Sequence, residues 1–137
     1  MKARAAAFES FLKAYPESLV RKNVLEHLED IYQGLSDQAM AAARSAKSQE
    51  AATKAVSEAN DDTSKELATA TDLLKLDPTH LKAIFYSAVI EERQGHQAND
   101  IKVLDSAADL ARKGLALSKP DSVSAGDWNK LSGVAAY

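Results

Sequence analysis

Apolar residues recur along most of the chain at intervals of three and four positions, which is the period of an amphipathic helix rather than of a strand. Prolines and glycines divide this pattern into segments, because proline cannot continue a helix and glycine weakens one. The pattern predicts an all-α fold of about seven helices. They are one ending at Pro16, one from Ser18 to Gly34, one from about Gln38 to Asn60, one from Asp61 to Pro78, one from about Thr79 to Gln94, one ending at Pro120 and one beginning at Ser124.

The boundary between the third and fourth predicted helices rests on Asp61-Asp-Thr-Ser-Lys-Glu66. Thr63 and Glu66 fit a capping box, and the two aspartates suit the positive end of a helix dipole. The preceding helix, from about Gln38 to Asn60, has high helix propensity but only a thin stripe of alanines as its apolar face. Burying alanine contributes far less than the ~1.5–3 kcal/mol of a buried leucine. This helix therefore either approaches a neighbour closely or is partly loose at its far end.

The fifth predicted helix is apolar around most of its circumference, and the sixth carries two interleaved apolar seams. A helix with this pattern is covered on more than one side and belongs in the middle of a structure. These features favour a stack of antiparallel hairpins over a single closed bundle. Within the hairpins, Gly34 and a turn at Gly95–Asn99 would separate one helix from the next.

Composition narrows the classes that remain. Five glycines and three prolines in 137 residues leave too little turn-forming material for a β-sandwich or barrel, and the length suits a single domain over residues 1–137. There is no cysteine, so the chain has no disulfide and no thiolate zinc site. A net charge of −3 offers no basic field for nucleic acid, and no run approaches the ~20 apolar residues of a membrane span. The sequence stops at Tyr137 inside an apolar pattern, so we expect a fragment of a longer protein.

An internal repeat occurs at the predicted helix ends. Leu12-Lys-Ala-Tyr-Pro16 and Leu74-Lys-Leu-Asp-Pro78 share the pattern Leu-Lys-x-x-Pro, and Leu115-Ala-Leu-Ser-Lys-Pro120 is the same ending with one residue inserted. A short polar stretch and then another helix follow each proline. Because proline cannot continue a helix but suits the entry to the next one, it would fix the corner between two hairpins.

These helix ends resemble those of the tetratricopeptide repeat family. Leu73-Leu-Lys-Leu-Asp-Pro78 is similar to the family's repeat boundary, and Ala88 and Gly95 match its small crossing residue and closing glycine. Phe11-Leu-Lys-Ala-Tyr-Pro-Glu-Ser18 is similar to the repeat opening common in bacterial envelope members. The resemblance implies a short α-solenoid of stacked antiparallel hairpins that binds a partner in its groove. On the groove side of the fifth helix it places Lys82, Phe85, Val89 and Glu92.

Motifs for catalysis or metal binding are not found in the sequence. His27, His80 and His96 stand in none of the spacings that bind zinc or a di-iron pair. Glu92 and His96 are four residues apart, which predicts a surface pair. No glycine-rich phosphate loop or nucleophile elbow occurs. We therefore expect no catalytic residue, no cofactor and no metal.

The sequence thus predicts a non-catalytic interaction module that binds a protein or peptide. One alternative is a helical bundle that assembles with itself as a homodimer, with the Ala-rich helix from Gln38 to Asn60 as its interface. A second alternative is a small hydrolase or lyase on a helical scaffold, which would need acids and histidines clustered in space. The cytoplasm and the bacterial periplasm both fit a soluble chain of this composition.

Overall fold

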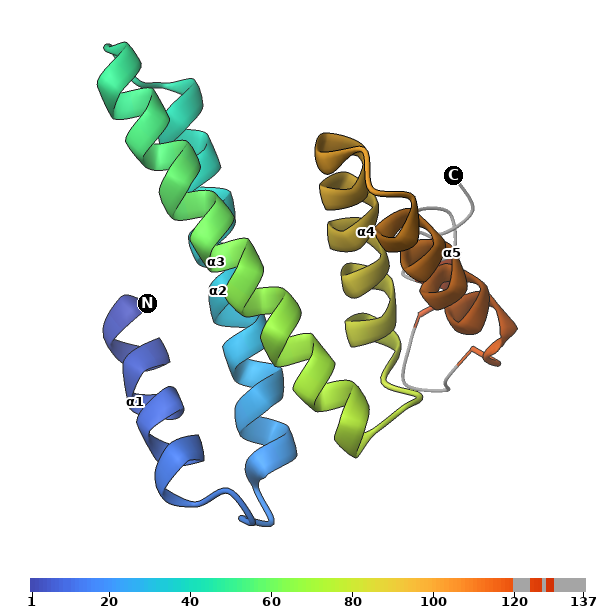
Figure 1. Ribbon diagram of the computed structural model, residues 1–137. Coiled ribbons are helices and arrows are strands. Elements are labelled where there is room, and N and C mark those ends of the chain that lie inside the picture. Colours follow the sequence, from blue (N-terminus) through green and yellow to red (C-terminus); the bar gives the residue numbers. More distant parts are fainter. Residues whose placement is uncertain (120–123, 127, 130–137) are drawn as a thin grey trace. The chain divides into compact units, whose positions relative to one another are not determined.

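The fold is that of a computed structural model, which describes residues 1–119, 124–126 and 128–129. These residues contain no strand, and they contain five principal helices (Figure 1): α1 (Lys2–Ala14), α2 (Arg21–Arg44), α3 (Gln49–Leu76), α4 (Leu81–Ala98) and α5 (Ile101–Ala116). The all-α prediction is confirmed, whereas the prediction of about seven helices is wrong. Most of the last predicted helix, after Ser124, lies outside the described residues.

The chain divides into two compact units, whereas the sequence predicts a single domain for residues 1–137. Unit 1 comprises Met1–Leu73 and unit 2 comprises Leu74–Tyr137, so the boundary falls within the last turn of α3. Each unit is described below by itself.

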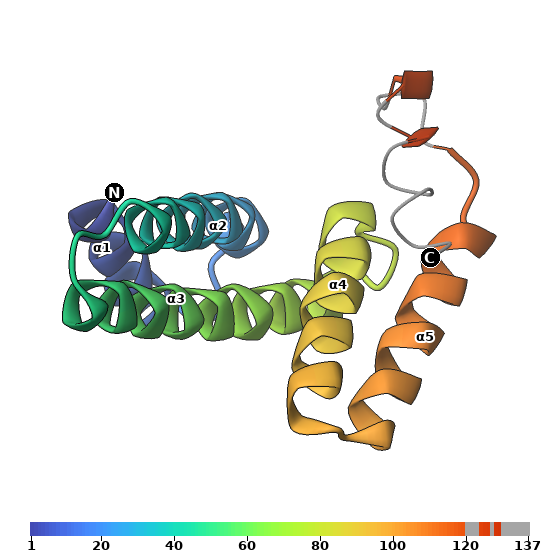
Figure 2. The same ribbon diagram turned by 90° about the horizontal axis from the view of Figure 1, so that it is seen from above.

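In unit 1, α1 and α2 form an antiparallel hairpin, and α3 returns along α2 (Figures 1 and 2). The core of the hairpin consists of side chains from one face of each helix. They are Ala5, Leu28, Ile31, Tyr32 and Leu35, with Phe8 and Leu12 packed against them. The three- and four-residue spacing in the sequence places each set on one helix face, as predicted.

Helix α2 continues through Gly34, where the sequence predicts a break. Ile31 and Leu35 on either side are buried. Burial of such side chains contributes ~1.5–3 kcal/mol each, which exceeds the ~1 kcal/mol that a glycine costs inside a helix. A Cβ at position 34 would lie 3.3 Å from Sδ of Met1, so the glycine faces the beginning of α1.

Helix α3 likewise continues through the predicted capping box. Thr63 Oγ1 lies 2.8 Å from Ser36 Oγ on α2, so the threonine joins two helices and does not begin one. The Ser36 hydroxyl also donates a hydrogen bond to the backbone carbonyl of Ala59, at 3.3 Å. A bond from a short side chain to a neighbouring backbone requires a close approach of the two helices. The buried alanine side chain permits that approach.

The break between α2 and α3 lies at residues 45–48, inside the segment predicted as one Ala-rich helix. At the start of α3, the Ser48 hydroxyl accepts a hydrogen bond from the amide of Ala51, at 3.2 Å. This is the interaction of an N-cap serine with one of the unsatisfied amides of a helix start. The predicted helix from Gln38 to Asn60 is therefore wrong: this segment contains the end of α2, a turn and the first part of α3.

Pro16 and Pro78 both lie in connections between helices, as predicted. After Pro16, the amide of Ser18 donates to the carbonyl of Tyr15; after Pro78, the amide of His80 donates to the carbonyl of Asp77. The two turns use the same positions relative to the proline, with distances of 3.2 and 3.0 Å. The corners after the shared Leu-Lys-x-x-Pro pattern are thus equivalent in their backbone bonding. Pro120 lies outside the described residues.

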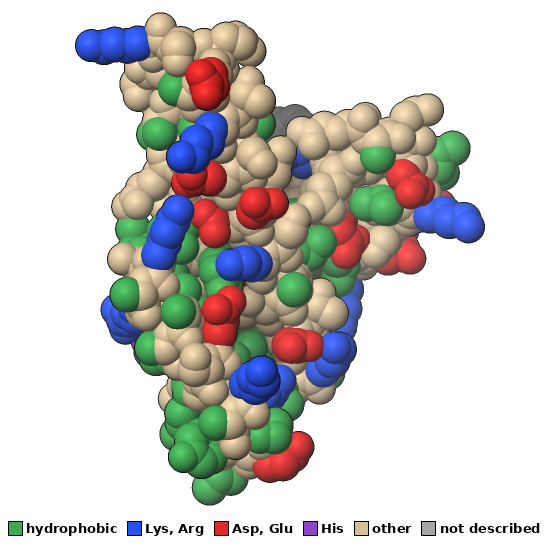
Figure 3. All heavy atoms as spheres, turned by 60° about the vertical axis from the view of Figure 1, so that its left-hand side comes forward, with side chains coloured by type: hydrophobic (Ala, Val, Ile, Leu, Met, Phe, Trp, Pro, Cys, Tyr) green, Lys and Arg blue, Asp and Glu red, His purple; other side chains and the backbone are tan. Residues whose placement is uncertain are grey.

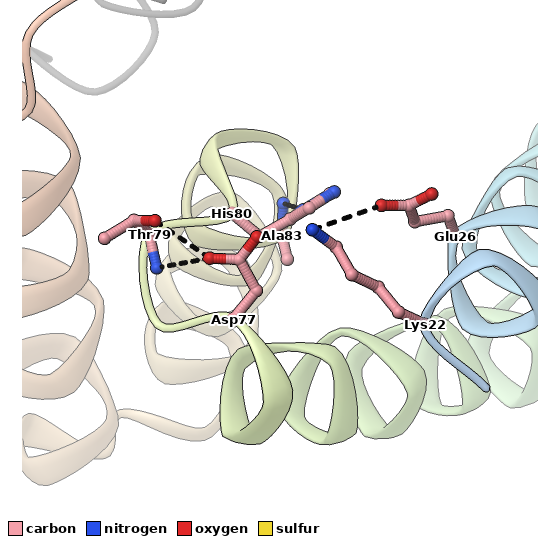
Figure 4. Close-up of polar contacts among 6 residues, drawn as sticks. All are labelled: Lys22, Glu26, Asp77, Thr79, His80 and Ala83. Atoms are coloured by element: carbon pink, nitrogen blue, oxygen red, sulfur yellow. Dashed lines mark hydrogen bonds and ion pairs between the residues drawn. The ribbon is translucent and has the colours of Figure 1, made fainter. Parts of the chain in front are cut away.

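The corner that opens unit 2 carries additional side-chain bonds (Figure 4). The Asp77 carboxylate accepts from the amide and the hydroxyl of Thr79, at 3.1 and 2.8 Å. Nδ1 of His80 accepts from the amide of Ala83, at 3.2 Å, and so caps α4. The same view includes the surface pair of unit 1 in which Lys22 Nζ lies 3.9 Å from Glu26.

Unit 2 is built on an antiparallel hairpin of α4 and α5. Gly95 does not form the predicted turn, because α4 continues through it to Ala98. The C-cap residue Asn99 has a φ of 51°, the left-handed conformation found at many helix ends. The amides of Asp100 and Asn99 bond back to the carbonyls of Gly95 and His96. Gly95 is buried, and a Cβ there would lie only 2.7 Å from Cγ of Leu104. The glycine thus permits a close crossing of α4 and α5.

The predicted stack of short, similar hairpins is not what unit 1 contains. Helices α2 and α3 have 24 and 28 residues, because each of them merges segments that the sequence pattern separates. The local signals at Gly34 and Asp61–Glu66 are weaker than the burial of the helix faces that run through them. The coarse prediction of a helical hairpin architecture remains, but not the solenoid with about seven helices.

Candidate functional site

A hollow of unit 1 lies between α1 and α3, with α2 as its floor; we call it the α1–α3 groove. It consists of two adjoining parts, of about 290 and 260 Å³, which share Glu9, Tyr32 and Lys65. Its lining residues are Lys2, Ala5, Ala6, Glu9, Leu12, Leu25, Leu28, Tyr32, Leu35, Glu58, Asp61, Asp62, Lys65, Ala68, Thr69 and Asp72.

The helical period explains how α1 contributes to this groove. Lys2, Ala6 and Glu9 recur at intervals of four and three residues, so they lie on one face of the helix. The small side chain of Ala6 leaves space between the two charged residues. Ala5 lies beside this face, on the side of the core, and its packing onto α2 holds α1 in place.

Tyr32 is at the centre of the groove. Its hydroxyl donates a short hydrogen bond to the Glu9 carboxylate. The ammonium of Lys65 lies 5.4 Å from the centre of the tyrosine ring, within the range of a cation–π interaction. The pKa of Tyr32 is raised well above 10.0, first by burial, then by the hydrogen bond to Glu9 and by the negative charges of Glu9 and Asp62. Tyr32 is therefore surrounded by both negative and positive side chains of the groove.

The two ends of the groove differ in chemistry. At one end, Lys2 Nζ lies 3.1 Å from the Glu58 carboxylate, beside Asp61 and Asp62. The side chains of Lys2 and Glu58 are 70% and 44% exposed, so this ion pair contributes little to stability. At the other end the wall and floor include Leu12, Leu25, Leu28 and Ala68. Arg21 of α2 and Asp72 of α3 form an ion pair there, at 3.7 Å.

The charged side chains of the groove are carboxylates and lysines. In the part of the chain that the structure describes, no three acidic or histidine side chains are placed to hold a metal ion. The carboxylates of the groove are accompanied by lysines, not by a nucleophile with an adjacent base. The groove thus combines an acidic rim with an apolar floor.

The raised pKa of Tyr32 predicts that the protein loses stability as the pH rises above about 10. The folded state holds the tyrosine proton more tightly than the unfolded state, so this stabilisation is fully present below the unfolded pKa and is lost as the pH rises toward the folded pKa. Urea unfolding at about pH 9 and about pH 11 measures the loss. Tyr32→Phe should reduce the pH dependence. Tyr15→Phe, at a residue that is 60% exposed, should leave it unchanged; equal behaviour of the two variants would contradict the assignment.

A second surface of unit 1 is apolar. It lies where α1 meets α2, and we call it the apolar corner: Phe11, Tyr15, Pro16, Leu19 and Val20. The rings of Phe11 and Tyr15 are 5.3 Å apart between centres. A hollow of about 420 Å³ is lined by these two residues with Pro16, Glu17 and Ser18. Leu19 is completely exposed, and Tyr15 and Val20 are exposed by 60% and 50%.

Figure 3 shows a face of the molecule that combines these properties. On the left of the view, Lys and Arg side chains alternate with Asp and Glu side chains, and hydrophobic side chains gather at the lower end. Unit 1 thus carries both a charged surface and an apolar surface.

The predicted groove residues Lys82, Phe85, Val89 and Glu92 all lie in α4, on one side of it. Lys82 Nζ lies 5.3 Å from the ring of Tyr86, and Glu92 lies 3.1 Å from His96, which is the predicted surface pair. Val89 is half-buried. Phe85 is only 2% exposed and contacts Trp128 edge to face, with 6.5 Å between ring centres. A partner-binding role of these four residues stays a prediction, and Phe85 offers almost no accessible surface for it.

The sequence did not indicate the α1–α3 groove. The sequence pattern places Asp61 and Asp62 at a helix start and gives no sign that they lie near Tyr32. Glu9 and Tyr32 are 23 positions apart, and Lys2 and Glu58 are 56 positions apart. The only local signal is the repeated placement of charges beside alanines on α1, which does not identify the opposite helix.

The histidines have local roles in the structure. His27 stacks on Phe8, with 6.0 Å between ring centres. The guanidinium of Arg4 also lies over the Phe8 ring, 5.4 Å from its centre. His80 caps α4, and His96 pairs with Glu92. None of these contacts joins two histidines.

Comparison with models of known protein families, with curated proteins and with solved structures finds no match to this chain. The resemblance to tetratricopeptide repeats therefore stays a prediction. Among the residues that the structure describes, none of the helices is long and apolar enough to cross a bilayer.

Proposed function

We propose that this chain is a non-catalytic protein-interaction module, and that unit 1 binds the partner. The observation that carries the proposal is the apolar corner. Soluble monomers rarely leave adjacent large apolar side chains in water, because each Å² of buried apolar surface contributes about 25 cal/mol. Three such side chains, Tyr15, Leu19 and Val20, lie within six positions, and each is at least half exposed.

The corner has the chemistry of an interface centre. Tyrosine is enriched among the residues that dominate binding energy, and a tyrosine packed on a neighbouring aromatic ring is held in position before binding. Phe11 provides that ring. The turn after Pro16 fixes the backbone through the bond from the Ser18 amide to the Tyr15 carbonyl. A partner would therefore meet a surface with little conformational freedom to lose.

Two further considerations support an interaction module. Helical repeats of the kind that the sequence resembles act through their shape and surface rather than through catalysis. The polar groove beside the hairpin supplies a charged rim, which favours specificity and fast association. A groove on α4 that contains Lys82, Phe85, Val89 and Glu92 is the weaker alternative, because Phe85 is buried.

The proposal is tested by replacing the exposed side chains of the corner. The full-length chain is immobilised and exposed to a lysate, and the retained proteins are quantified against the variant Tyr15→Ser/Leu19→Ser/Val20→Ser. We expect specifically retained proteins to fall at least about tenfold, because the loss of buried apolar side chains costs more than 1.4 kcal/mol. Ile101→Ser/Leu115→Ser, which changes exposed apolar residues of α5, is the control and should retain them. Retention of the same proteins by the corner variant would contradict the proposal.

Self-association remains the second candidate, and one exposed residue of the Ala-rich segment favours it. Val56 on α3 is 39% exposed, and its neighbours in this segment are mostly alanine and serine. Our proposal predicts a monomer in sedimentation equilibrium at micromolar concentration. A tight dimer that Val56→Ser dissociates would instead support the homodimer.

A further inference from the structure

We infer that the α1–α3 groove binds a basic amphipathic segment of a partner polypeptide. This inference rests on the proposed interaction function and adds the chemical class of the partner. It stands on the geometry of the groove, on the distribution of charge along it and on the position of its apolar floor.

The groove accepts an elongated occupant. Its two hollows adjoin at Glu9, Tyr32 and Lys65, and they extend along α1 and α3 on both sides of these residues. A helix or an extended segment laid along a groove between two helices is a common mode of peptide recognition. The floor is rigid, because Tyr32 and Leu35 belong to the core of the α1–α2 hairpin.

Charge is concentrated in this groove. Its lining contains five carboxylates, Glu9, Glu58, Asp61, Asp62 and Asp72, and two ammonium groups, Lys2 and Lys65. The net charge of the lining is therefore −3, which equals the net charge of the whole chain. The remainder of the protein is neutral on balance. The groove is thus the place where a positively charged segment gains electrostatic energy.

The two ends of the groove determine where basic and apolar side chains must lie in the bound segment. Lysine or arginine side chains of the partner would meet Asp61 and Asp62 beside the Lys2–Glu58 pair. An apolar side chain would lie over Leu12 and Ala68, where the lining is mostly apolar. A segment with lysine or arginine residues in one part and apolar residues in another would match both ends of the groove. A nucleic acid or an anionic membrane would be repelled by the same carboxylates.

The test uses two labelled synthetic peptides and fluorescence anisotropy with the full-length chain. The first peptide is an amphipathic 14-residue helix of leucine and lysine; the second has glutamate at every lysine position. At about 0.15 M salt we expect the lysine peptide to bind at least about tenfold more tightly than the glutamate peptide. Equal affinities, or no binding of the lysine peptide, would overturn the inference.

Charge reversal then locates the binding site. Asp61→Lys/Asp62→Lys should weaken binding of the lysine peptide about tenfold, because two attractive interactions become repulsive. The matched control is Asp105→Lys/Asp109→Lys on α5, which changes the net charge of the protein equally and should alter affinity less than about twofold. Both pairs lie inside helices, where lysine is a better helix former than aspartate. Equal weakening by the two variants would show attraction by net charge alone and would overturn the assignment to the groove.

A failure of the groove inference can be distinguished from a failure of the proposed interaction function. If the corner variant loses its retained proteins whereas Asp61→Lys/Asp62→Lys keeps them, unit 1 is an interaction module and the groove is not the site of the basic segment. If neither variant changes retention, the proposed function itself fails.

Discussion

Replacing Gly114 with alanine should destabilise the protein by about 1–2 kcal/mol, although alanine is normally the better helix former by about 1 kcal/mol. A Cβ at this position of α5 would lie 2.6 Å from Cε1 of Phe85 and 3.1 Å from Cγ2 of Ile84. Both side chains are fully buried in α4 and cannot rotate into solvent. Urea unfolding followed by tryptophan fluorescence measures the effect. Trp128 is the one tryptophan of the chain, and its ring lies against Phe85.

Gly34→Ala is the matched control for this prediction. It makes the same change inside a helix, but the nearest atom to the new Cβ is the flexible and exposed side-chain end of Met1. That side chain can move aside, so the helix propensity of alanine should raise the free energy of unfolding by about 0.5–1 kcal/mol. Unfolding energies that change in the same direction for both variants would contradict the close packing of α4 and α5 at Gly114.

Replacing Leu28 with alanine should have the largest effect, a loss of about 2–5 kcal/mol in the free energy of unfolding. Leu28 is 2% exposed and belongs to the core between α1 and α2. Its neighbours include Ile31 and Tyr32 on its own helix and Ala5 on α1, and none of them can fill the cavity without leaving its own contacts. Urea unfolding followed by circular dichroism at about 222 nm measures the loss.

The control for Leu28 is Leu19→Ala, which removes the same atoms from a fully exposed residue. It should change the free energy of unfolding by less than about 0.5 kcal/mol. A comparable loss in both variants would mean that Leu19 is covered in solution. A small loss in Leu28→Ala would mean that α1 does not pack on α2 as described.

The sequence predicted the helix ends that proline determines, and it missed the places where burial outweighs a local signal. Pro16 and Pro78 end α1 and α3 because a proline has no amide to donate and clashes with the preceding turn. Gly34 and the capping box at Thr63 are weaker signals, worth about 1 kcal/mol each. The buried residues on either side of them contribute more, so α2 and α3 pass through both positions.

The candidate site was less predictable than the fold. The identity of Tyr32 as a buried residue follows from its spacing with Leu28 and Leu35. Its contact with Glu9 does not, because it depends on how α1 lies on α2, and the approach of Asp62 depends on the uninterrupted course of α3. Long helices bring charges from distant parts of the chain into one groove, and a helix boundary placed wrongly at residue 60 conceals this arrangement.

The continuity of α2 and α3 is the central claim, since both the groove and the turn at residues 45–48 depend on it. The most direct measurement is the backbone Cα chemical shift, obtained by nuclear magnetic resonance from the full-length chain. We predict helical shifts through residues 33–36 and 60–64 and a loss of helical shifts at 45–48. Helical shifts through 45–48, with interruptions at Gly34 and Asn60, would contradict the account.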